Sequence, residues 1–152
     1  MFKYLNFSLN KLLKACLLKL DISLVDFKTF DRSVQLLNKT NQFNLVSKRF
    51  SSLQLKNFLI KKNSFAFITK LKDVYGDHGY TALAMISKQN NNWKIINFLL
   101  SCRILGRKAE DEFLHQIILK AKKQNIIEIR GFYKKTDQNH QCKDFFIKNN
   151  FI

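Results

Sequence analysis

Apolar and polar residues alternate in some segments of the chain, as in strands, and apolar residues recur every three to four positions in others, as in helices. The alternating pattern comes first. Three apolar residues alternate with polar or smaller ones, which predicts a strand over residues 19–27. A helix is expected over residues 31–39, with Asp31 as its cap. Before residue 19 lysines interrupt an amphipathic pattern, so we expect a short helical extension packed on the domain, with a surface-associating helix as the alternative.

The middle of the chain predicts a second helix and three strands. The helix begins at Ser51 or Ser52, and its apolar residues through Leu59 share one face. The segments with strand character are residues 65–74, 80–88 and 93–101. The sequences between them, YGDHG at 75–79 and QNNN at 89–92, are typical of turns. The three strands are therefore predicted to form antiparallel hairpins.

The last third predicts a long helix followed by a strand and a short helix. Apolar residues recur at three- and four-residue steps over residues 108–123, with acids in the first turn and lysines in the last. A strand is expected over residues 126–132, and a right-handed crossover through the helix would place it parallel to strand 93–101. The final helix covers residues 142–148. This order predicts an α+β fold with a mixed, mostly antiparallel sheet flanked by helices.

The turn before the long helix has the chemistry of an anion site. A helix start leaves backbone N–H groups unpaired and carries the positive end of the helix dipole, so a phosphate group can bind there. Gly106 lets the backbone approach a ligand closely, and Arg103, Arg107 and Lys108 add positive charge. Many connections of this shape bind nothing, so the turn is a candidate site only.

Several separate motifs resemble one protein family. The string SCRILGR, with Arg103-x-x-Gly106, resembles the coenzyme A pyrophosphate loop of GNAT acyltransferases, where a small residue usually stands in place of Lys108. Four blocks, in this order and spacing, resemble the C-terminal GNAT-like domain of FkbH-like proteins: KTNQFNLVSKRF (39–50), YGDHG (75–79), FLLSCRILGR (98–107) and KDFFIKNNF (143–151). Those proteins usually carry a HAD-type phosphatase-like domain ahead of this one, for which the sequence has no room before Leu20.

The resemblance implies a GNAT fold over residues 19–152, preceded by an N-terminal extension at 1–18. GNAT domains usually continue with two more strands after the position of Phe151, so the sheet is expected to lack its last two strands. A partner could supply them, the sheet could end in an exposed edge through which copies of the chain associate, or the sequence could be truncated.

The resemblance also implies residues that bind the cofactor, acyl-CoA or a phosphopantetheine group. In the GNAT architecture the strands before the turn and after the long helix splay apart, and the pantetheine arm lies between them. The implied residues are Leu99, Leu100 and Ser101 for pantetheine, Cys102, Arg103, Ile104, Leu105, Gly106, Arg107 and Lys108 for pyrophosphate, and Asn139 and Phe146 near the cofactor. Core packing is the alternative for the two leucines.

Residues that could contact the acceptor or act in catalysis are fewer. By resemblance, Asn41, Gln42 and Asn44 lie near the acceptor, or they cap neighbouring helices. Many GNAT enzymes use a tyrosine at the position of Phe146 to protonate the leaving thiolate, and a phenyl ring has no proton to give. The candidates for catalysis are Asp77 and His78 as a base and Tyr133 as an acid, with solvated turn residues and a packed ring as the alternatives.

Composition narrows the choice of partners and compartment. The formal net charge of +16 would ordinarily suggest nucleic acid, but the lysines are spread along the chain without a nucleic-acid motif, as an AT-rich genome would produce. The 3 cysteines have no metal-ligand spacing, and neither a signal peptide nor a membrane-spanning run is evident. We therefore expect a cytoplasmic protein with free thiols that binds no metal and no nucleic acid.

These features predict a GNAT-like acyltransferase domain that transfers an acyl group from acyl-CoA or an acyl carrier protein to an unknown acceptor. The alternative is a non-catalytic domain that binds a phosphopantetheine arm or docks a carrier protein beside a separately encoded HAD-type enzyme. Either role would suit the positive surface, because carrier proteins are acidic and charge complementarity raises association rates.

Overall fold

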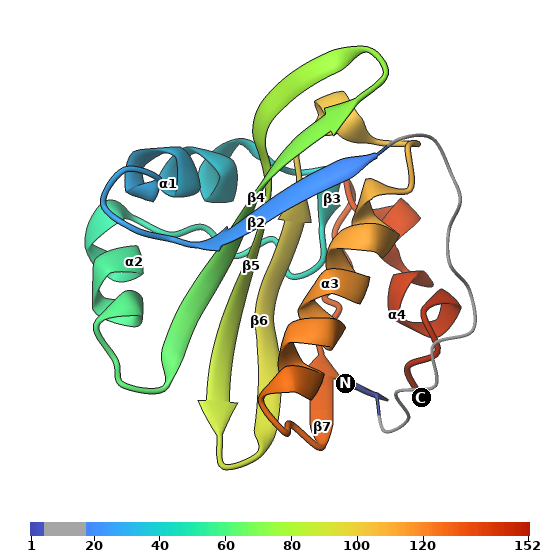
Figure 1. Ribbon diagram of the computed structural model, residues 1–152. Coiled ribbons are helices and arrows are strands. Elements are labelled where there is room, and N and C mark those ends of the chain that lie inside the picture. The colour runs from blue at the N-terminus through green and yellow to red at the C-terminus, as the bar shows by residue number, and fades with distance from the viewer. Residues whose placement is uncertain (5–17) are drawn as a thin grey trace.

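The computed structural model describes residues 1–4 and 18–152, whose strands form one mixed sheet with helices on both faces (Figure 1). The strands are β1 (Phe2–Tyr4), β2 (Lys19–Leu24), β3 (Phe43–Asn44), β4 (Ser64–Asp73), β5 (Gly76–Gln89), β6 (Asn92–Leu100) and β7 (Glu128–Gly131). The α-helices are α1 (Phe30–Lys39), α2 (Ser52–Leu59), α3 (Ala109–Lys123) and α4 (Phe145–Lys148), and 3-10 turns lie at Cys102–Ile104 and His140–Cys142. The predicted α+β class is confirmed.

The order of the strands agrees with the predicted connections. The sheet runs β1-β7-β6-β5-β4-β2, and the short β3 pairs with β6 off this path. β4, β5 and β6 form antiparallel hairpins, whereas β6 and β7 are parallel and are joined through α3. The first hairpin turn is tighter than predicted, because β5 already begins at Gly76 and only Val74 and Tyr75 separate it from β4.

Each face of the sheet has its own core, because successive side chains of a strand point to opposite faces. Leu83 and Met85 of β5 belong to the core that α1 and α2 cover. Ala84 and Ile86, the alternate residues of the same strand, belong to the core that α3 and α4 cover. Figure 1 shows these two pairs of helices on opposite sides of the sheet. The middle of β5, residues 81–86, is thus buried on both faces, which explains the run of apolar residues that follows Thr81.

The helix starts follow local hydrogen bonding. Ser51 caps α2 as predicted, and it forms a reciprocal capping box with Gln54. The prediction that Asp31 caps α1 is wrong, because this helix begins one residue earlier, at Phe30. A turn in which Asp26 and Thr29 bond each other's side chain and backbone precedes it, so Asp31 already lies within the first helical turn.

The two ends of the chain lie side by side at the β7 edge of the sheet. β1 pairs antiparallel with β7, and Lys3 exchanges backbone hydrogen bonds of 2.7 Å in both directions with Ile152. Residues 2–4 are therefore a strand and not the predicted helix, and they pair with β7, so this edge is not left open as one of the three alternatives had it. The rest of the predicted extension, residues 5–17, lies outside the described residues. No helix in the described part of the chain is both long and apolar enough to cross a membrane.

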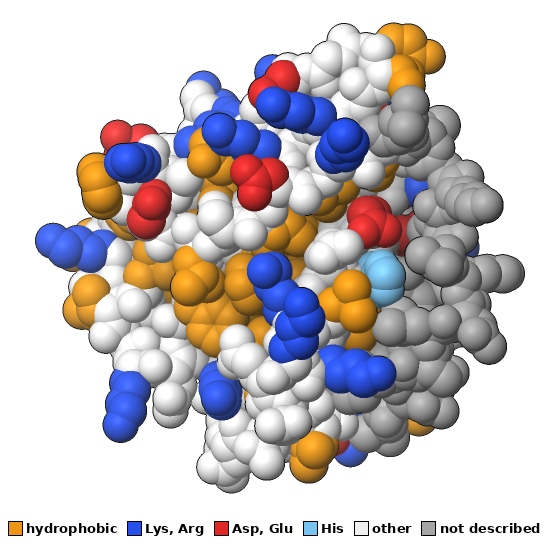
Figure 2. All heavy atoms as spheres, in the orientation of Figure 1, with side chains coloured by type: hydrophobic (Ala, Val, Ile, Leu, Met, Phe, Trp, Pro, Cys, Tyr) orange, Lys and Arg blue, Asp and Glu red, His pale blue; other side chains and the backbone are white. Residues whose placement is uncertain are grey.

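A surface groove lies between β4 and the last turn of α3. Its floor is apolar, formed by Leu24, Phe65 and Phe67, and Lys62, Lys120 and Lys123 border a volume of about 460 Å³. Figure 2 shows apolar side chains gathered on this face with lysine or arginine side chains beside them. The Nζ of Lys120 lies 5.8 Å from the centre of the Phe67 ring, so the lysine stem partly covers the floor.

Candidate functional site

The two parallel strands β6 and β7 separate halfway along β6. Their pairing extends only from Asn92 opposite Glu128 to Ile95 opposite Gly131, while β6 continues to Leu100. Parallel strands that part in this way leave unpaired backbone groups on the facing edge of the longer strand. The gap between β6 and the chain after β7 is the place where the resemblance to GNAT proteins implies a pantetheine arm.

A segment of the chain itself occupies this gap. β3 pairs antiparallel with the end of β6, with Phe43 opposite Leu100 and Asn44 opposite Leu99. The N–H of the next residue, Leu45, donates to the Phe98 carbonyl at 3.0 Å, and the Leu45 carbonyl accepts from the Lys134 N–H at 2.8 Å. Residues 43–45, which we call the cleft segment, therefore bridge the two sides of the gap.

Two buried asparagines hold the cleft segment. The amide of Asn139 donates to the carbonyls of Asn44 at 2.9 Å and Lys134 at 3.0 Å, and its Oδ1 accepts from the Thr136 N–H at 2.8 Å. The side chain of Asn44 donates to the Thr40 carbonyl at 3.1 Å and accepts from the Ser47 N–H at 2.8 Å. Both side chains act within the chain. The prediction that Asn44 contacts an acceptor does not fit its burial, whereas its bond to Thr40, the C-cap residue of α1, fits the alternative that it caps a neighbouring helix.

The other two predicted acceptor residues lie at the surface beside the end of β6. Asn41 accepts a hydrogen bond of 2.7 Å from the exposed Arg49, and Gln42 is exposed. Both line a cavity of about 440 Å³ together with Lys39, Cys102, Asp137 and Gln138. Contact with an acceptor remains a prediction for this pair.

The loop from β6 to α3 contains the predicted pyrophosphate residues. Ser101 leaves β6 by donating its N–H to the Thr81 carbonyl at 2.7 Å, and the N–H groups of Ile104 and Leu105 are used within the following 3-10 turn. Gly106 has φ of +79° and Lys108, the N-cap of α3, has φ of +58°, so the chain turns sharply into the helix. In this loop Ile104 is fully buried, Leu105 packs against the core, and Cys102, Arg103, Gly106 and Lys108 are exposed.

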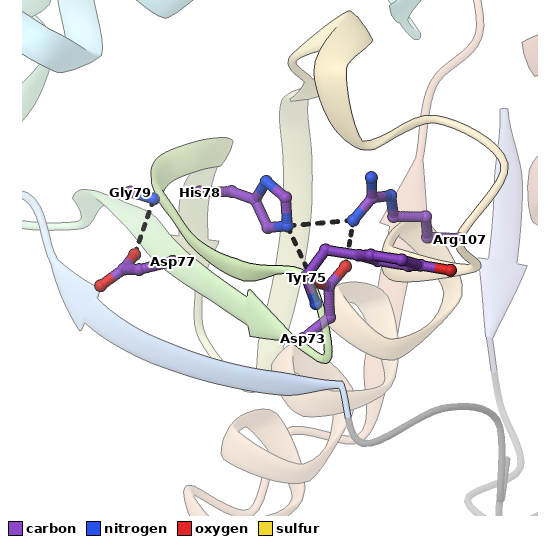
Figure 3. A network of polar contacts seen from close by, with 6 residues as sticks. All are labelled: Asp73, Tyr75, Asp77, His78, Gly79 and Arg107. Carbon is purple, nitrogen blue, oxygen red and sulfur yellow. Dashed lines mark hydrogen bonds and ion pairs between the residues drawn. The ribbon is translucent and has the colours of Figure 1, made fainter.

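Arg107 of this loop is already paired. Its guanidinium donates to the carboxylate of Asp73, lies 2.9 Å from His78 Nε2, and stacks over the Tyr75 ring at 5.3 Å (Figure 3). These contacts tie the loop to the β4–β5 hairpin. Of the three basic residues that sequence assigns to a phosphate group, Arg103 and Lys108 are the two that remain exposed.

Asp73, which the sequence-based interpretation missed, is the acidic partner of His78. The carboxylate lies 2.9 Å from His78 Nε2 and accepts the Tyr75 N–H at 2.8 Å. Burial alone would raise the pKa of Asp73, but hydrogen bonds from His78, the Tyr75 N–H and Arg107 outweigh it and lower this pKa to about 2. The signal in the sequence was an aspartate at the first position of a two-residue turn, a common site for side-chain bonding to backbone.

Asp77 and His78, the two predicted candidates for a base, have separate partners in the structure. Asp77 bonds the Gly79 N–H at 2.8 Å and Lys72 at 3.2 Å, and Figure 3 shows it directed away from the histidine. The backbone bond to Gly79, followed by the bond to Lys72, lowers the pKa of Asp77. Because neighbouring residues of a strand point to opposite faces, residues 77 and 78 of β5 cannot share a site. Both residues belong to β5, which begins at Gly76, and not to the turn in which they were predicted.

Tyr133 and Phe146, the remaining predicted residues, differ in exposure. The Tyr133 hydroxyl is 3.4 Å from the Oδ1 of Asn139, and burial, then the nearby Cys142 and Asp144, raises the pKa of this half-buried tyrosine. Phe146 is only 1% exposed and packs on Gly131, where an added Cβ would lie 2.2 Å from its ring. The predicted contact of Phe146 with a cofactor is therefore wrong: the ring is part of the core.

Comparison with known proteins identifies the fold. No family model and no curated protein matches the sequence. A PaiA N-acetyltransferase from Thermoplasma acidophilum, solved with coenzyme A, is 12% identical, with a TM-score of 0.65 over 86% of this chain and 88% of that one. The ribosomal-protein-alanine N-acetyltransferase of Brucella melitensis biovar Abortus is 10% identical, with a TM-score of 0.64 over 85% and 90%. The chain has the GNAT fold.

The ribosomal-protein-S18-alanine N-acetyltransferase of Escherichia coli has the same fold but is longer. It is 10% identical, with a TM-score of 0.56 over 71% of this chain, and the match covers 63% of the Escherichia coli protein. At these identities the likeness establishes the GNAT fold alone. The closer resemblance to FkbH-like proteins stays a prediction.

Coenzyme A fits the GNAT-fold site of this chain only in part. The exposed Arg103 and Lys108 beside the start of α3 suit its phosphate groups, although α3 also carries Glu110, Asp111 and Glu112 in its first turn. The pantetheine arm does not fit along β6, because the cleft segment already bonds that edge. Among the described residues no cluster of His, Cys, Asp or Glu has the arrangement of metal ligands.

Proposed function

We propose that this chain acts in acyl transfer, as an acyltransferase domain of the GNAT fold that uses an acyl thioester of coenzyme A or of a carrier protein. The observation that carries the proposal is the glycine-containing loop at the start of α3 in a chain that has the GNAT fold. The same loop holds the exposed Arg103 and Lys108, whose charge suits the phosphate groups that both donors share.

Tyr133 is the residue of this site best able to supply a proton to a departing thiolate. Its hydroxyl carries a proton at neutral pH and lies 3.4 Å from the Oδ1 of Asn139, the residue that bonds the cleft segment. Asp73 and His78 have a different role in this account: they fix Arg107 and so hold the shape of the loop.

The test is thiol release from acyl thioesters, measured with a thiol-reactive dye in the presence of a panel of primary amines. Acyl-CoA and an acylated carrier protein serve as separate donors. We expect release that falls at least tenfold in the double variant Arg103→Ala/Lys108→Ala. The control variant Lys61→Ala/Lys62→Ala removes two exposed charges elsewhere and should keep the rate. Absence of release with every donor and acceptor from folded protein would refute the enzyme.

The second candidate is a non-catalytic domain that docks a phosphopantetheine-bearing carrier protein. The filling of the cleft by residues 43–45 favours it, as does Phe146 in the position where the resemblance expects a proton donor. Such a domain would bind an acylated carrier protein without releasing thiol. Binding that is unchanged over hours, with the thioester intact by mass spectrometry, would favour docking over catalysis.

A further inference from the structure

The cleft segment uses the hydrogen-bonding edge that β6 exposes after it parts from β7. Its three residues lie opposite residues 98–100 of β6, and Leu45 bonds Phe98 on one side and Lys134 on the other. A ligand with amide groups would need the same edge to lie along β6. The cleft segment and such a ligand are therefore alternatives for one set of backbone partners.

The side chains of the cleft segment belong to the core. Phe43 is 5% exposed and meets the Phe145 ring edge-on at 5.3 Å, while Leu45 is completely buried in the same cluster. Asn44, the residue between them, points to the other face and is 1% exposed. A surface strap poised to open would leave at least one face to solvent, and this segment leaves none.

Further hydrogen bonds hold the middle of the segment and the residue that precedes it. Asn139 donates to its carbonyl at Asn44, and the Cys142 thiol lies 3.4 Å from the carbonyl of Gln42 just before it. The amide of Asn139 is itself fully buried, so releasing the segment would leave a buried donor without its partner. Core packing and buried polar bonds thus oppose opening together.

We infer that residues 43–45 fill the GNAT cleft permanently in the folded chain, so that no pantetheine arm lies along β6. This inference has one consequence that rests on the proposed function. If the chain is an acyltransferase, the donor presents its thioester outside the cleft segment. A cavity of about 440 Å³, lined in part by Asn41, Gln42 and Cys102, lies just outside the start of the cleft segment. Arg103, next to Cys102, is exposed at the same end.

Amide hydrogen exchange tests this inference in the unmodified chain. The N–H groups of Leu45 and Lys134 should exchange as slowly as those of the buried strand β5, because they open only with the core. Coenzyme A at millimolar concentration should leave both rates unchanged within twofold. Exchange at the rate of an exposed loop, or acceleration of Leu45 by tenfold or more on adding coenzyme A, would overturn it.

A pair of matched variants tests whether the side chain of Asn139 holds the cleft segment in place. Asn139→Ala should speed exchange of Leu45 and Lys134 at least tenfold while β5 amides change little. Asn149→Ala removes a side-chain amide that bonds Asp111 and the Phe145 carbonyl, and it should leave Leu45 unaffected. Equal exchange rates of the Leu45 amide in both folded variants would show that Asn139 does not hold the cleft segment. If Asn139→Ala does not fold, the exchange measurements on the unmodified chain still decide.

Thiol release measured on the same samples separates this inference from the proposed function. Release with unchanged exchange at Leu45 supports both. No release with unchanged exchange removes the proposed enzyme and leaves the closed cleft standing. Release accompanied by faster exchange at Leu45 keeps the enzyme and overturns the closed cleft.

Discussion

The Nε2 atom of His78 lies 2.9 Å from the Oδ1 atom of Asp73, whose side chain is only 4% exposed. Because the same carboxylate also accepts from Arg107, the hairpin between β4 and β5 is bonded to the loop that precedes α3. The shape of the predicted phosphate loop therefore depends on a carboxylate 34 residues earlier in the sequence. Because this carboxylate is charged, its ionisation should affect the stability of the fold.

Asp73 should make stability depend on acid. Its pKa in the folded chain, about 2, is below the ordinary value of 3.8, so its ionised form stabilises the fold above pH 4 and this contribution is lost as pH falls from about 4 toward 2. The free energy of unfolding, measured by urea titration across this range, should fall more steeply in the unmodified chain than in Asp73→Asn. Parallel curves would show that Asp73 contributes nothing.

Leu45 should behave as a core residue. Leu45→Ala is expected to lower the free energy of unfolding by about 2–5 kcal/mol, the range for emptying a buried leucine site. Leu53→Ala on α2 is the matched control, because that leucine is 65% exposed, and it should change stability by less than about 0.5 kcal/mol. Equal, small losses in both variants would mean that the cleft segment is peripheral.

Restoring a tyrosine at position 146 should not restore a proton donor. The tip of the Phe146 ring points at Gly131, so a hydroxyl there would press on backbone, and Phe146→Tyr should destabilise the fold by about 1–3 kcal/mol. Chemical denaturation measures this loss, and Phe145→Tyr tests whether any added hydroxyl in the region has the same effect. A stable Phe146→Tyr variant with faster thiol release would contradict the placement of this ring.

Gly131 and Phe146 should be coupled. Gly131→Ala alone places a methyl group within 2.7 Å of three ring atoms and should cost stability, whereas in the Phe146→Ala background the same change should be nearly neutral. A double-mutant cycle should therefore give a coupling free energy of about 1 kcal/mol or more. Additive losses would mean that the two residues do not touch.

Tyr133 should carry the proton transfer if the chain is an enzyme. Tyr133→Phe is expected to slow thiol release by about 10²–10⁴-fold, the usual contribution of a general acid, without changing stability much. Tyr75→Phe is the control, because that tyrosine is 82% exposed and lies at the hairpin turn. Unaltered release in Tyr133→Phe would require another donor.

The sequence predicted what local patterns determine. The cap at Ser51 and the apolar period of α3 depend on near neighbours, and these two helices begin within one residue of the predicted positions. β1 and β3 were missed because each is only two or three residues long and is stabilised by partners remote in the chain. Short strands carry too few residues for their period to be read.

The candidate site also combines residues that a local pattern reveals with residues that only the fold brings together. Gly106 and the helix start were visible as a local pattern, but the occupant of the cleft depends on where a loop 55 or so residues earlier is placed. Likewise, Asn44 and Asn139 lie 95 residues apart, and the hydrogen bond between them could not be inferred from spacing. Resemblance to a family supplied ligand roles for both residues, and the hydrogen bonds inside this chain assign them to its own backbone.

The most direct test of the whole account is a titration of ¹⁵N-labelled chain with coenzyme A, followed by amide chemical shifts. The account predicts shifts at Arg103, Gly106, Lys108 and the first residues of α3, without shifts at Phe98, Leu99 or Leu100. Shifts along β6 would contradict the closed cleft. No shifts in the loop at millimolar coenzyme A would contradict its role as the phosphate site of an acyl donor.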